Sequence, residues 1–242
     1  MAGHSKWATT KRHKAIVDTK RGKLFSLIGK EITIAVRIGG SNPEFNVRLR
    51  ALILKAKAAN MPTENIAKAI KKGTGEIPGI NIEELTYEGY AAGGVSLIVE
   101  VTTDNRNRSA SEVRSLFHKY QGKLASTGSL SHSFQRRGQL LVERVDCPDE
   151  NLFIEIALEA GAEDVLSHAD HFEIICMVNE CDAVAQFLAE KKILIESLEL
   201  IYIPRSTISV TDLETRKRVQ RLIDELDSLE DVKSIWKNLS AG

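Results

Sequence analysis

The chain has 242 residues, of which 43% are hydrophobic and 27% are charged, and its 33 Lys and Arg residues balance 33 Asp and Glu residues. This composition excludes a wholly disordered or collagen-like chain, and the length allows about one to three domains with hydrophobic cores. The three cysteines form no CxxC pair, which favours a reducing cytosol over a disulfide framework, and no apolar run approaches the roughly 20 residues of a membrane span.

The zero total charge conceals an unequal distribution. Residues 1–72 contain 16 Lys and Arg but 4 acids, a net of +12, whereas the remaining 170 residues contain 17 bases and 29 acids, a net of −12. Such asymmetry is typical of a polyanion-binding segment joined to an acidic body. The alternative is a solvated surface, but such surfaces usually mix both signs. We therefore expect polyanion contacts within the first 72 residues.

Residues 1–23 show no strong apolar period, so we predict a basic arm that is mobile or weakly helical. The arm lacks the hydrophobic stretch and cleavage pattern of a targeting peptide, and we expect it in a mature cytoplasmic protein. Its bases can neutralise phosphates, and Trp7 can stack on an unpaired base. The alternative is a disordered tail with Trp7 packed against the next helices. The candidate contacts are Lys6, Trp7, Lys11, Arg12, His13, Lys14, Lys20, Arg21 and Lys23.

Residues 24–79 show three helical patterns, which predict a small bundle. The first apolar stripe runs from Leu24 to the Gly39-Gly40 pair, which we expect to end the helix. The second helix is expected to begin at an Asn42 N-cap, and the third runs from about Thr63 to Lys72. The bases border the apolar stripes, and a phosphate-binding surface and a merely solvated one fit this pattern equally. These bases are Arg48, Arg50, Lys55, Lys57, Lys68, Lys71 and Lys72.

After the Gly-rich linker 73–79, the pattern becomes α+β. Ser109 and Glu112 form a capping box for a helix that Gly122 is expected to close. Strands are predicted at 85–90, 95–103 and 129–134.

The loop 104–108 joins a predicted strand to the N-terminus of the Ser109 helix. Amide groups and the helix dipole at that end favour an anion, and Arg106 and Arg108 could grip a phosphate there. The alternative is that the two arginines pair with neighbouring acids.

Residues 136–204 show the order βαββαβ, which is the split βαβ or ferredoxin-like unit. Its strands are predicted at 139–145, 163–168, 171–178 and 193–203, and its helices at 149–160 and 180–191.

Residues 205–242 contain a strand TISV, a capping box formed by Thr211 and Glu214, a helix and a last strand DVKSIW. These elements supply what residues 80–135 lack, so we predict one discontinuous α+β domain from 80–135 and 205–242. The ferredoxin-like domain 136–204 is then inserted into it. The predicted fold class is α+β multidomain, with an N-terminal three-helix bundle followed by two α+β domains.

Several strings carry more information than these patterns. They include MAGHSKWATTKRHKA, GGSNPEFNVRLR, AIKKGTG, YEGY and TDNRNR. In this order, and over essentially the whole chain, they closely resemble the YebC/PmpR family, which also includes the mitochondrial translational activator of cytochrome c oxidase subunit I. The resemblance implies a helical domain followed by two α+β domains, and a cytoplasmic, non-enzymatic regulator of gene expression. Most bacterial members are described as probable DNA-binding transcriptional regulators, and some act on the ribosome in translation.

The sequence departs from the family pattern at three places. The arm reads WATTKRHKA where WANIKHRKA is usual, and Ala91-Ala92 replaces a usual Gly-Pro pair. Gln135-Arg136-Arg137 replaces an acid and a lysine, which makes that hairpin more basic.

Other chemistry has little support in the sequence. A metal site would need His168, Asp170, His171 and Cys176, but we expect the two histidines to face different ways on a tight hairpin and to be structural. The GxSxG, GxxxxGK and GxGxxG signatures are absent. We therefore expect no metal, no cofactor and no enzymatic activity.

Three functions remain. The first is a DNA-binding transcriptional regulator whose basic arm and bundle bind phosphates, and the second is a translation factor that binds ribosomal RNA. The third is a protein-interaction scaffold whose charge asymmetry serves solubility alone. No helix shows a recognisable groove-reading motif, and the oligomeric state and target genes are not encoded in these patterns.

Overall fold

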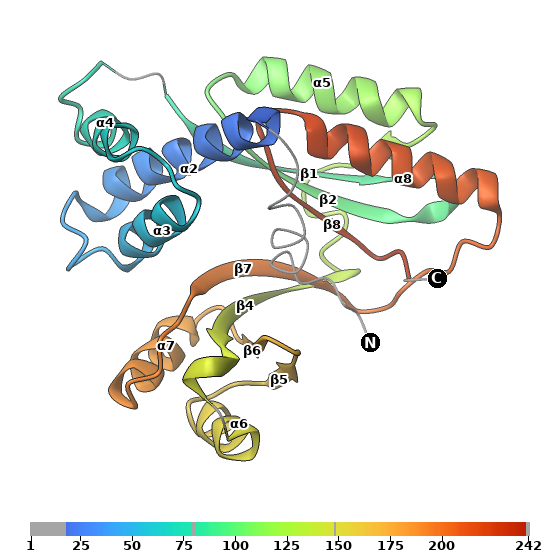
Figure 1. Cartoon of the computed structure of the whole chain (residues 1–242). Coiled ribbons are helices and arrows are strands. Elements are labelled where there is room, and N and C mark those ends of the chain that lie inside the picture. Colours follow the sequence, from blue (N-terminus) through green and yellow to red (C-terminus); the bar gives the residue numbers. More distant parts are fainter. Residues whose placement is uncertain (1–17, 79–80, 148, 241–242) are drawn as a thin grey trace. The chain divides into compact units, whose positions relative to one another are not determined.

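The computed structural model describes residues 18–78, 81–147 and 149–240 (Figure 1). These residues form two compact units. The first unit contains the described residues up to Ser133 together with those from Pro204 onward, and the second unit is Phe134–Ile203. Each unit contains one four-stranded sheet, which confirms the α+β class. Among the described residues, no helix combines the length and the apolar character that crossing a bilayer requires.

The first unit begins with three helices, α2 (Asp18–Gly39), α3 (Val47–Ala58) and α4 (Thr63–Thr74). They pack around a core of apolar side chains that includes Ile28 and Ile32 of α2, Leu49 of α3 and Ile66 of α4. Gly40 has a φ of 82°, the left-handed conformation that ends α2 where the sequence predicts.

Two helix starts differ from the predictions. Helix α2 begins at Asp18, within the predicted arm, and Lys23 on its second turn binds the carbonyl oxygen of Asp227. The N-cap of α3 is Asn46 and not Asn42, since the Asn46 side chain accepts the Leu49 N–H at 3.0 Å. Asn46 also donates to the carbonyls of Ala35 and Gly40, each at 2.8 Å, which ties the start of α3 to the end of α2.

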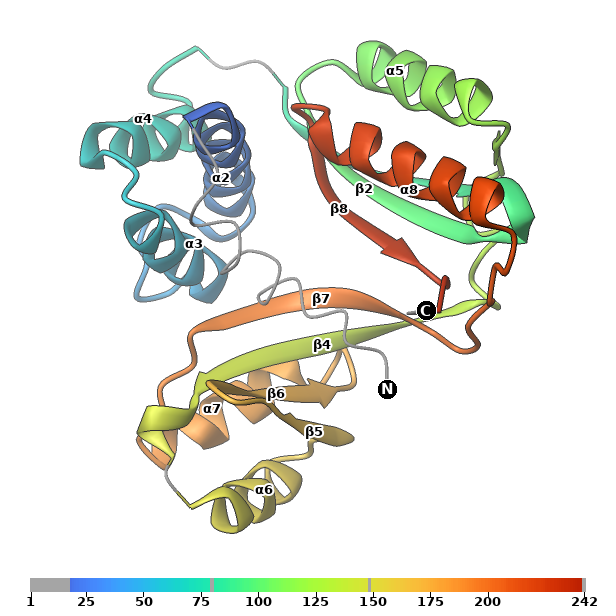
Figure 2. The same ribbon diagram turned by 45° about the vertical axis from the view of Figure 1, so that its right-hand side comes forward.

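The rest of the first unit is a sheet in the order β3-β1-β2-β8. Its strands are β1 (Glu83–Tyr90), β2 (Ser96–Thr103), β3 (Lys123–Leu124) and β8 (Val232–Lys237), and a 3-10 turn, η2 (Ala92–Gly94), joins β1 to β2. Helices α5 (Arg106–Lys119) and α8 (Leu213–Ser228) lie side by side over one face of this sheet (Figures 1 and 2). Strand β2 pairs antiparallel with both β1 and β8, so the sheet joins two segments that are distant in the sequence.

Both predicted capping boxes are misplaced: Ser109 lies after the observed cap of its helix, and Thr211 lies one residue before the observed cap of its own. Helix α5 begins at Arg106 with Asn105 as its N-cap, and α8 begins at Leu213 with Asp212 as its N-cap. Ser109 is therefore inside α5, where its hydroxyl contacts the buried Asp231 carboxylate at 2.8 Å.

Two predicted strands are wrong. Within 129–134 only Phe134 is extended, and the preceding residues form successive turns. The TISV segment forms only a single parallel bridge, between Ile208 and Leu239.

The second unit has the order βαββαβ, and its sheet order β5-β6-β4-β7 is that of a ferredoxin-like fold. Its core lies between the sheet and the two helices and includes Phe153, Phe172, Ile174 and Leu188. Its elements are β4 (Phe134–Glu143), the 3-10 turn η3 (Arg144–Asp146), α6 (Glu150–Glu159), β5 (Asp164–Ser167), β6 (His171–Cys176), α7 (Cys181–Glu190) and β7 (Ser197–Pro204).

The chain leaves and re-enters the first unit at a single narrow point. Ser133 precedes β4 and Arg205 follows β7, and the Arg205 N–H donates to the Ser133 carbonyl at 2.9 Å.

Candidate nucleic-acid interface

Part of the predicted arm lies outside the described residues. This applies to the candidates Lys6, Trp7, Lys11, Arg12, His13 and Lys14, and the side chain of Lys20 is likewise not described. The described candidates of the arm are Arg21, which is exposed on α2, and Lys23, which binds Asp227 through the carbonyl and, at 3.9 Å, the carboxylate.

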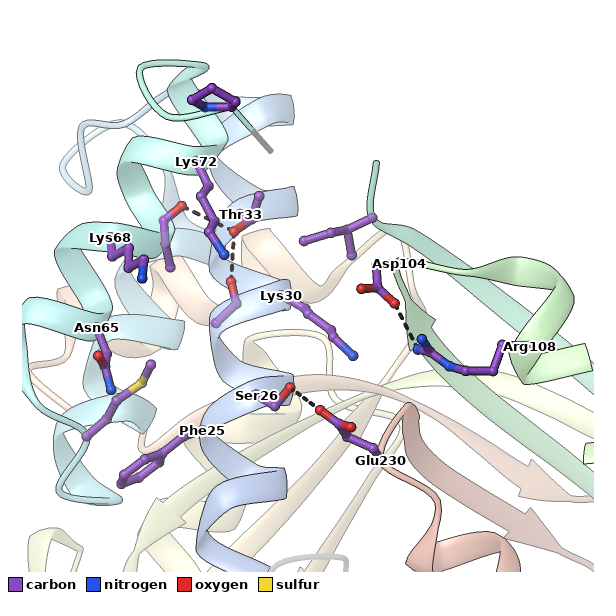
Figure 3. Close-up of a pocket in the computed structure, with 15 residues that line it drawn as sticks. Phe25, Ser26, Lys30, Thr33, Asn65, Lys68, Lys72, Asp104, Arg108 and Glu230 are labelled. Carbon is purple, nitrogen blue, oxygen red and sulfur yellow. Dashed lines mark hydrogen bonds and ion pairs between the residues drawn. The ribbon is translucent and has the colours of Figure 1, made fainter. Parts of the chain in front are cut away.

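A cleft of about 540 Å³ lies between α2, α4 and the start of α5 in the described first unit. Four basic side chains line it: Lys30 from α2, Lys68 and Lys72 from α4, and Arg108 from α5. Figure 3 shows the two α4 lysines on one side of the cleft, Arg108 on the other, and Lys30 between them. The fold thus gathers three predicted bases and one that the sequence analysis missed.

Helix periodicity places both α4 lysines on the same side of the cleft. Lys68 and Lys72 are four residues apart, and Ile66 and Ala69 anchor α4 in the bundle core. Neither lysine contacts an acid among the residues that the structure describes. Two positive charges therefore face the cleft without a neutralising partner from the described chain.

The opposite wall is organised around a buried carboxylate, Asp231. Its Oδ1 atom accepts from Lys30 at 2.5 Å, and its Oδ2 atom accepts from Arg108 at 2.7 Å, Ser109 at 2.8 Å and Thr103 at 2.9 Å. Burial alone raises the pKa of this carboxyl, but the four donated hydrogen bonds outweigh burial and hold the pKa well below its ordinary value. Asp231, which directly precedes β8, thus links α2 of the bundle to the end of β2 and the first turn of α5.

Arg108 is fixed at the cleft edge by two carboxylates. Its guanidinium contacts Asp231 at 2.7 Å and Asp104 at 2.8 Å, and these bonds raise its pKa above the ordinary arginine value. The neighbouring Arg106 lies exposed in the first turn of α5. The structure therefore brings Arg108, but not Arg106, to the cleft.

The predicted bases of α3 lie apart from the cleft. Arg48 pairs with Glu84 at 2.5 Å, whereas Lys57 is exposed and Lys55 is half-buried. Arg50 donates to the carbonyls of Pro43 and Glu44, each at 3.0 Å. Lys71 of α4 is also exposed but does not line the cleft.

Arg50 and Asn42 brace the loop that carries Phe45, an aromatic residue that sequence reasoning missed. The Phe45 N–H donates to the Asn42 carbonyl at 3.2 Å, yet its side chain is 83% exposed. An aromatic ring held open on a hydrogen-bonded loop offers a flat apolar surface beside a basic helix. With Asn42 as the expected N-cap, Phe45 would lie in the first turn of the second helix, four residues before Leu49, so the sequence pattern gave no signal for an exposed ring.

Comparison with known proteins adds evidence on ancestry. The model of the TACO1/YebC N-terminal domain matches residues 5–76, and that of the TACO1/YebC second and third domain matches residues 82–239. A probable transcriptional regulatory protein of Opitutus terrae is 46% identical over 98% of this chain and 96% of its own. A protein of the same description from Persephonella marina is 48% identical, over 98% and 95% of the two chains. The crystal structure of a conserved hypothetical protein from Aquifex aeolicus has a TM-score of 0.82 and 45% identity, and the match covers 93% of each chain. The chain therefore belongs to the TACO1/YebC family.

Proposed function

We propose that the chain is a non-enzymatic, cytoplasmic regulator of gene expression that binds nucleic acid through the cleft of the first unit. The observation that carries the proposal is the convergence of Lys30, Lys68, Lys72 and Arg108 on one cleft. The two α4 lysines supply charge for phosphates, while Asp231 holds Lys30 and Arg108 in fixed positions. The first candidate activity is DNA binding in transcription, which fits the description of relatives as probable transcriptional regulatory proteins.

Phosphate contacts would set the position of the protein without reading sequence. Lysine and arginine bind phosphates through charge and release counterions, but they give little base discrimination by themselves. The net negative charge of residues 73–242 disfavours nucleic acid over most of their surface, so we expect the contact to lie on the first 72 residues and on the adjoining Arg108.

The proposal is tested by removing the two α4 charges with Lys68→Gln and Lys72→Gln together. Each lost phosphate contact should reduce the slope of log K against log salt by about 0.9 on duplex DNA, so the double variant should lose about 1.8. The matched control is Lys191→Gln with Lys192→Gln, two exposed lysines of the second unit. Fluorescence anisotropy on a labelled duplex gives the slopes. An unchanged slope in the Lys68/Lys72 variant removes the cleft from nucleic-acid binding.

Phe45 favours a second candidate, binding to unpaired RNA bases in translation. Single-stranded bases stack on exposed aromatic rings, and each stack is worth about 1 to 3 kcal/mol. Phe45→Ala should then weaken binding to a single-stranded RNA by about 5- to 150-fold and leave duplex DNA binding unchanged. Leu213→Ala, at a side chain that is 71% exposed on α8, is the control. Equal effects of the two variants on RNA binding exclude Phe45 stacking.

Sucrose-gradient sedimentation of cell extract separates the candidates further. Comigration with ribosomal particles supports the translation candidate, and slow sedimentation with retention of promoter DNA supports the transcription candidate. If both assays are negative while a protein partner copurifies, the scaffold interpretation replaces the nucleic-acid proposal.

A further inference from the structure

The β5–β6 hairpin of the second unit gathers three potential metal ligands that the proposed function does not use. A ring nitrogen of His168, a ring nitrogen of His171 and a carboxylate oxygen of Glu173 all lie within 4.8 Å of one another. The Nε2 atom of His168 is 3.2 Å from the Oε2 atom of Glu173. The imidazole rings of the two histidines stack with their centroids 4.4 Å apart and their planes 14° apart.

Strand alternation explains why these groups meet. Within β6, Phe172 and Ile174 enter the core between sheet and helices, so His171 and Glu173 share the opposite face. His168 follows β5 on the other arm of the hairpin, and its N–H donates to the His171 carbonyl at 2.9 Å. The prediction that the two histidines face different ways is therefore wrong, because the hairpin closes with their rings in contact.

Two further side chains orient the potential ligands. Asp170 Oδ1 lies 2.7 Å from the Nδ1 atom of His171, an arrangement that places the proton on Nδ1 and the lone pair on Nε2. Gln139 of β4 donates to the Oε1 atom of Glu173 at 2.5 Å, which leaves Oε2 directed towards His168. Carboxylates and amides in these positions are the usual outer-shell partners of metal-binding histidines and carboxylates.

We propose that His168, His171 and Glu173 form a binding site for a divalent transition metal ion, of which Zn²⁺ is the best match. Imidazole nitrogens and a carboxylate oxygen are ligands that Zn²⁺ accepts, and three protein ligands leave one position for water. Ligand atoms of a tetrahedral zinc site lie about 3.3 Å apart, close to the 3.2 Å between His168 and Glu173.

Coordination requires one ring to leave the stack, because nearly parallel imidazole rings do not direct their in-plane lone pairs at one point. The widest separation of 4.8 Å must shrink by about 1.5 Å. His168 can provide this movement, because its side chain is 33% exposed while that of Glu173 is 8% exposed. Bound metal would clamp the two arms of the hairpin together at the end of the sheet, since all three ligands belong to this hairpin.

The test uses the full chain, freed of metal with a chelator and titrated with Zn²⁺ against a chromogenic competitor. We expect one tightly bound Zn²⁺ per chain that His168→Ala weakens more than tenfold. His118→Ala, at an exposed histidine of α5, should bind as the unaltered chain does. Substitution with Co²⁺ should give the visible absorption of a four-coordinate site, and His168→Ala should lose it.

A second variant guards against effects on folding. Asp170 is half-exposed, and Asp170→Asn should weaken Zn²⁺ binding about 10- to 100-fold while the circular dichroism spectrum stays unchanged. The proposal is overturned if the unaltered chain does not bind Zn²⁺, or if both His168→Ala and Asp170→Asn bind it as tightly as His118→Ala does.

Discussion

Replacing Asp231 by asparagine removes one of the charges that join the helical bundle to the sheet of the first unit. The substitution keeps the shape of the side chain but replaces one carboxylate oxygen by an amide group that donates hydrogen bonds. Because Oδ2 accepts from Arg108, Ser109 and Thr103, an amide at that position places donors against donors. Turning the amide around transfers the conflict to Lys30.

The expected cost is about 3 to 5 kcal/mol, the typical loss when one partner of a buried ion pair is removed. Asp231 is nearly fully buried, with 3% side-chain exposure, and the Lys30 side chain is 13% exposed, so water can replace little of the lost interaction. At about 2 to 4 °C per kcal/mol for a unit of this size, the melting temperature should fall by about 6 to 20 °C.

Differential scanning calorimetry of the full chain is the appropriate assay, because it can resolve the unfolding of the two units. Only the first unit's transition should shift. The pH dependence provides a second check, since the folded-state pKa of Asp231 lies below its unfolded-state value. Its carboxylate therefore stabilises fully above the unfolded-state pKa of about 3.9, and this stabilisation is lost as pH falls through the folded-state pKa. The stability difference between the unaltered chain and Asp231→Asn should accordingly be constant from about pH 5 to 8 and shrink below about pH 4.

The control is Asp104→Asn, which alters a carboxylate with 30% side-chain exposure that also contacts Arg108. A surface pair of this kind should contribute about 0 to 1 kcal/mol. If Asp231→Asn costs no more than Asp104→Asn, the buried carboxylate does not hold the bundle to the sheet and the reasoning is refuted.

Three further predictions concern the packing inside each unit. Burial raises the pKa of the Cys176 thiol to about 12, so the native chain should not react there with a disulfide reagent at pH 8; fast native-state labelling of that residue contradicts this. Gly73→Ala should lower the free energy of unfolding in urea by about 1 to 3 kcal/mol, because the added Cβ would lie 2.6 Å from the Cβ of Val36. Gly22→Ala has open space around the added Cβ and should raise the free energy of unfolding by about 0.5 to 1 kcal/mol. The opposite order of the two alanine variants would show that α2 and α4 do not pack closely. Asn46→Ala should cost about 2 kcal/mol by the same measurement, since it removes an N-cap and two hydrogen bonds to α2, and a loss below about 0.5 kcal/mol would contradict that role.

Periodicity predicted the helices and most strands because each depends on its own apolar pattern. It failed where two neighbouring residues could serve the same local role. Asn42 and Asn46 both suit an N-cap, and the choice of Asn46 depends on hydrogen bonds to the end of α2 that the local pattern does not contain. Ser109 was assigned to a cap for the same reason, although its hydroxyl is engaged by Asp231, 122 residues away.

The candidate site was predictable only in part. Charge counting identified the basic helices, and Lys68 and Lys72 emerged from it as exposed bases of the third helix. Lys30 did not, because its position depends on Asp231, which lies 201 residues further along the chain. Counting charges also could not distinguish Arg108, which two carboxylates hold, from Arg106 two residues earlier. Local sequence determines which residues are charged, whereas tertiary pairing determines which charges remain for a ligand.

The hydrogen bond between Arg205 and Ser133 has a consequence for the modular history of the chain. Because Ser133 and Arg205 are neighbours in space, a very short connection between them would keep the first unit continuous without Phe134–Ile203. Because the entropic cost of closing a loop rises only slowly with its length, inserted segments of other lengths or folds can occupy this junction at a small cost. Relatives or designed hybrids that differ greatly between these two residues should still retain the helical bundle and its sheet.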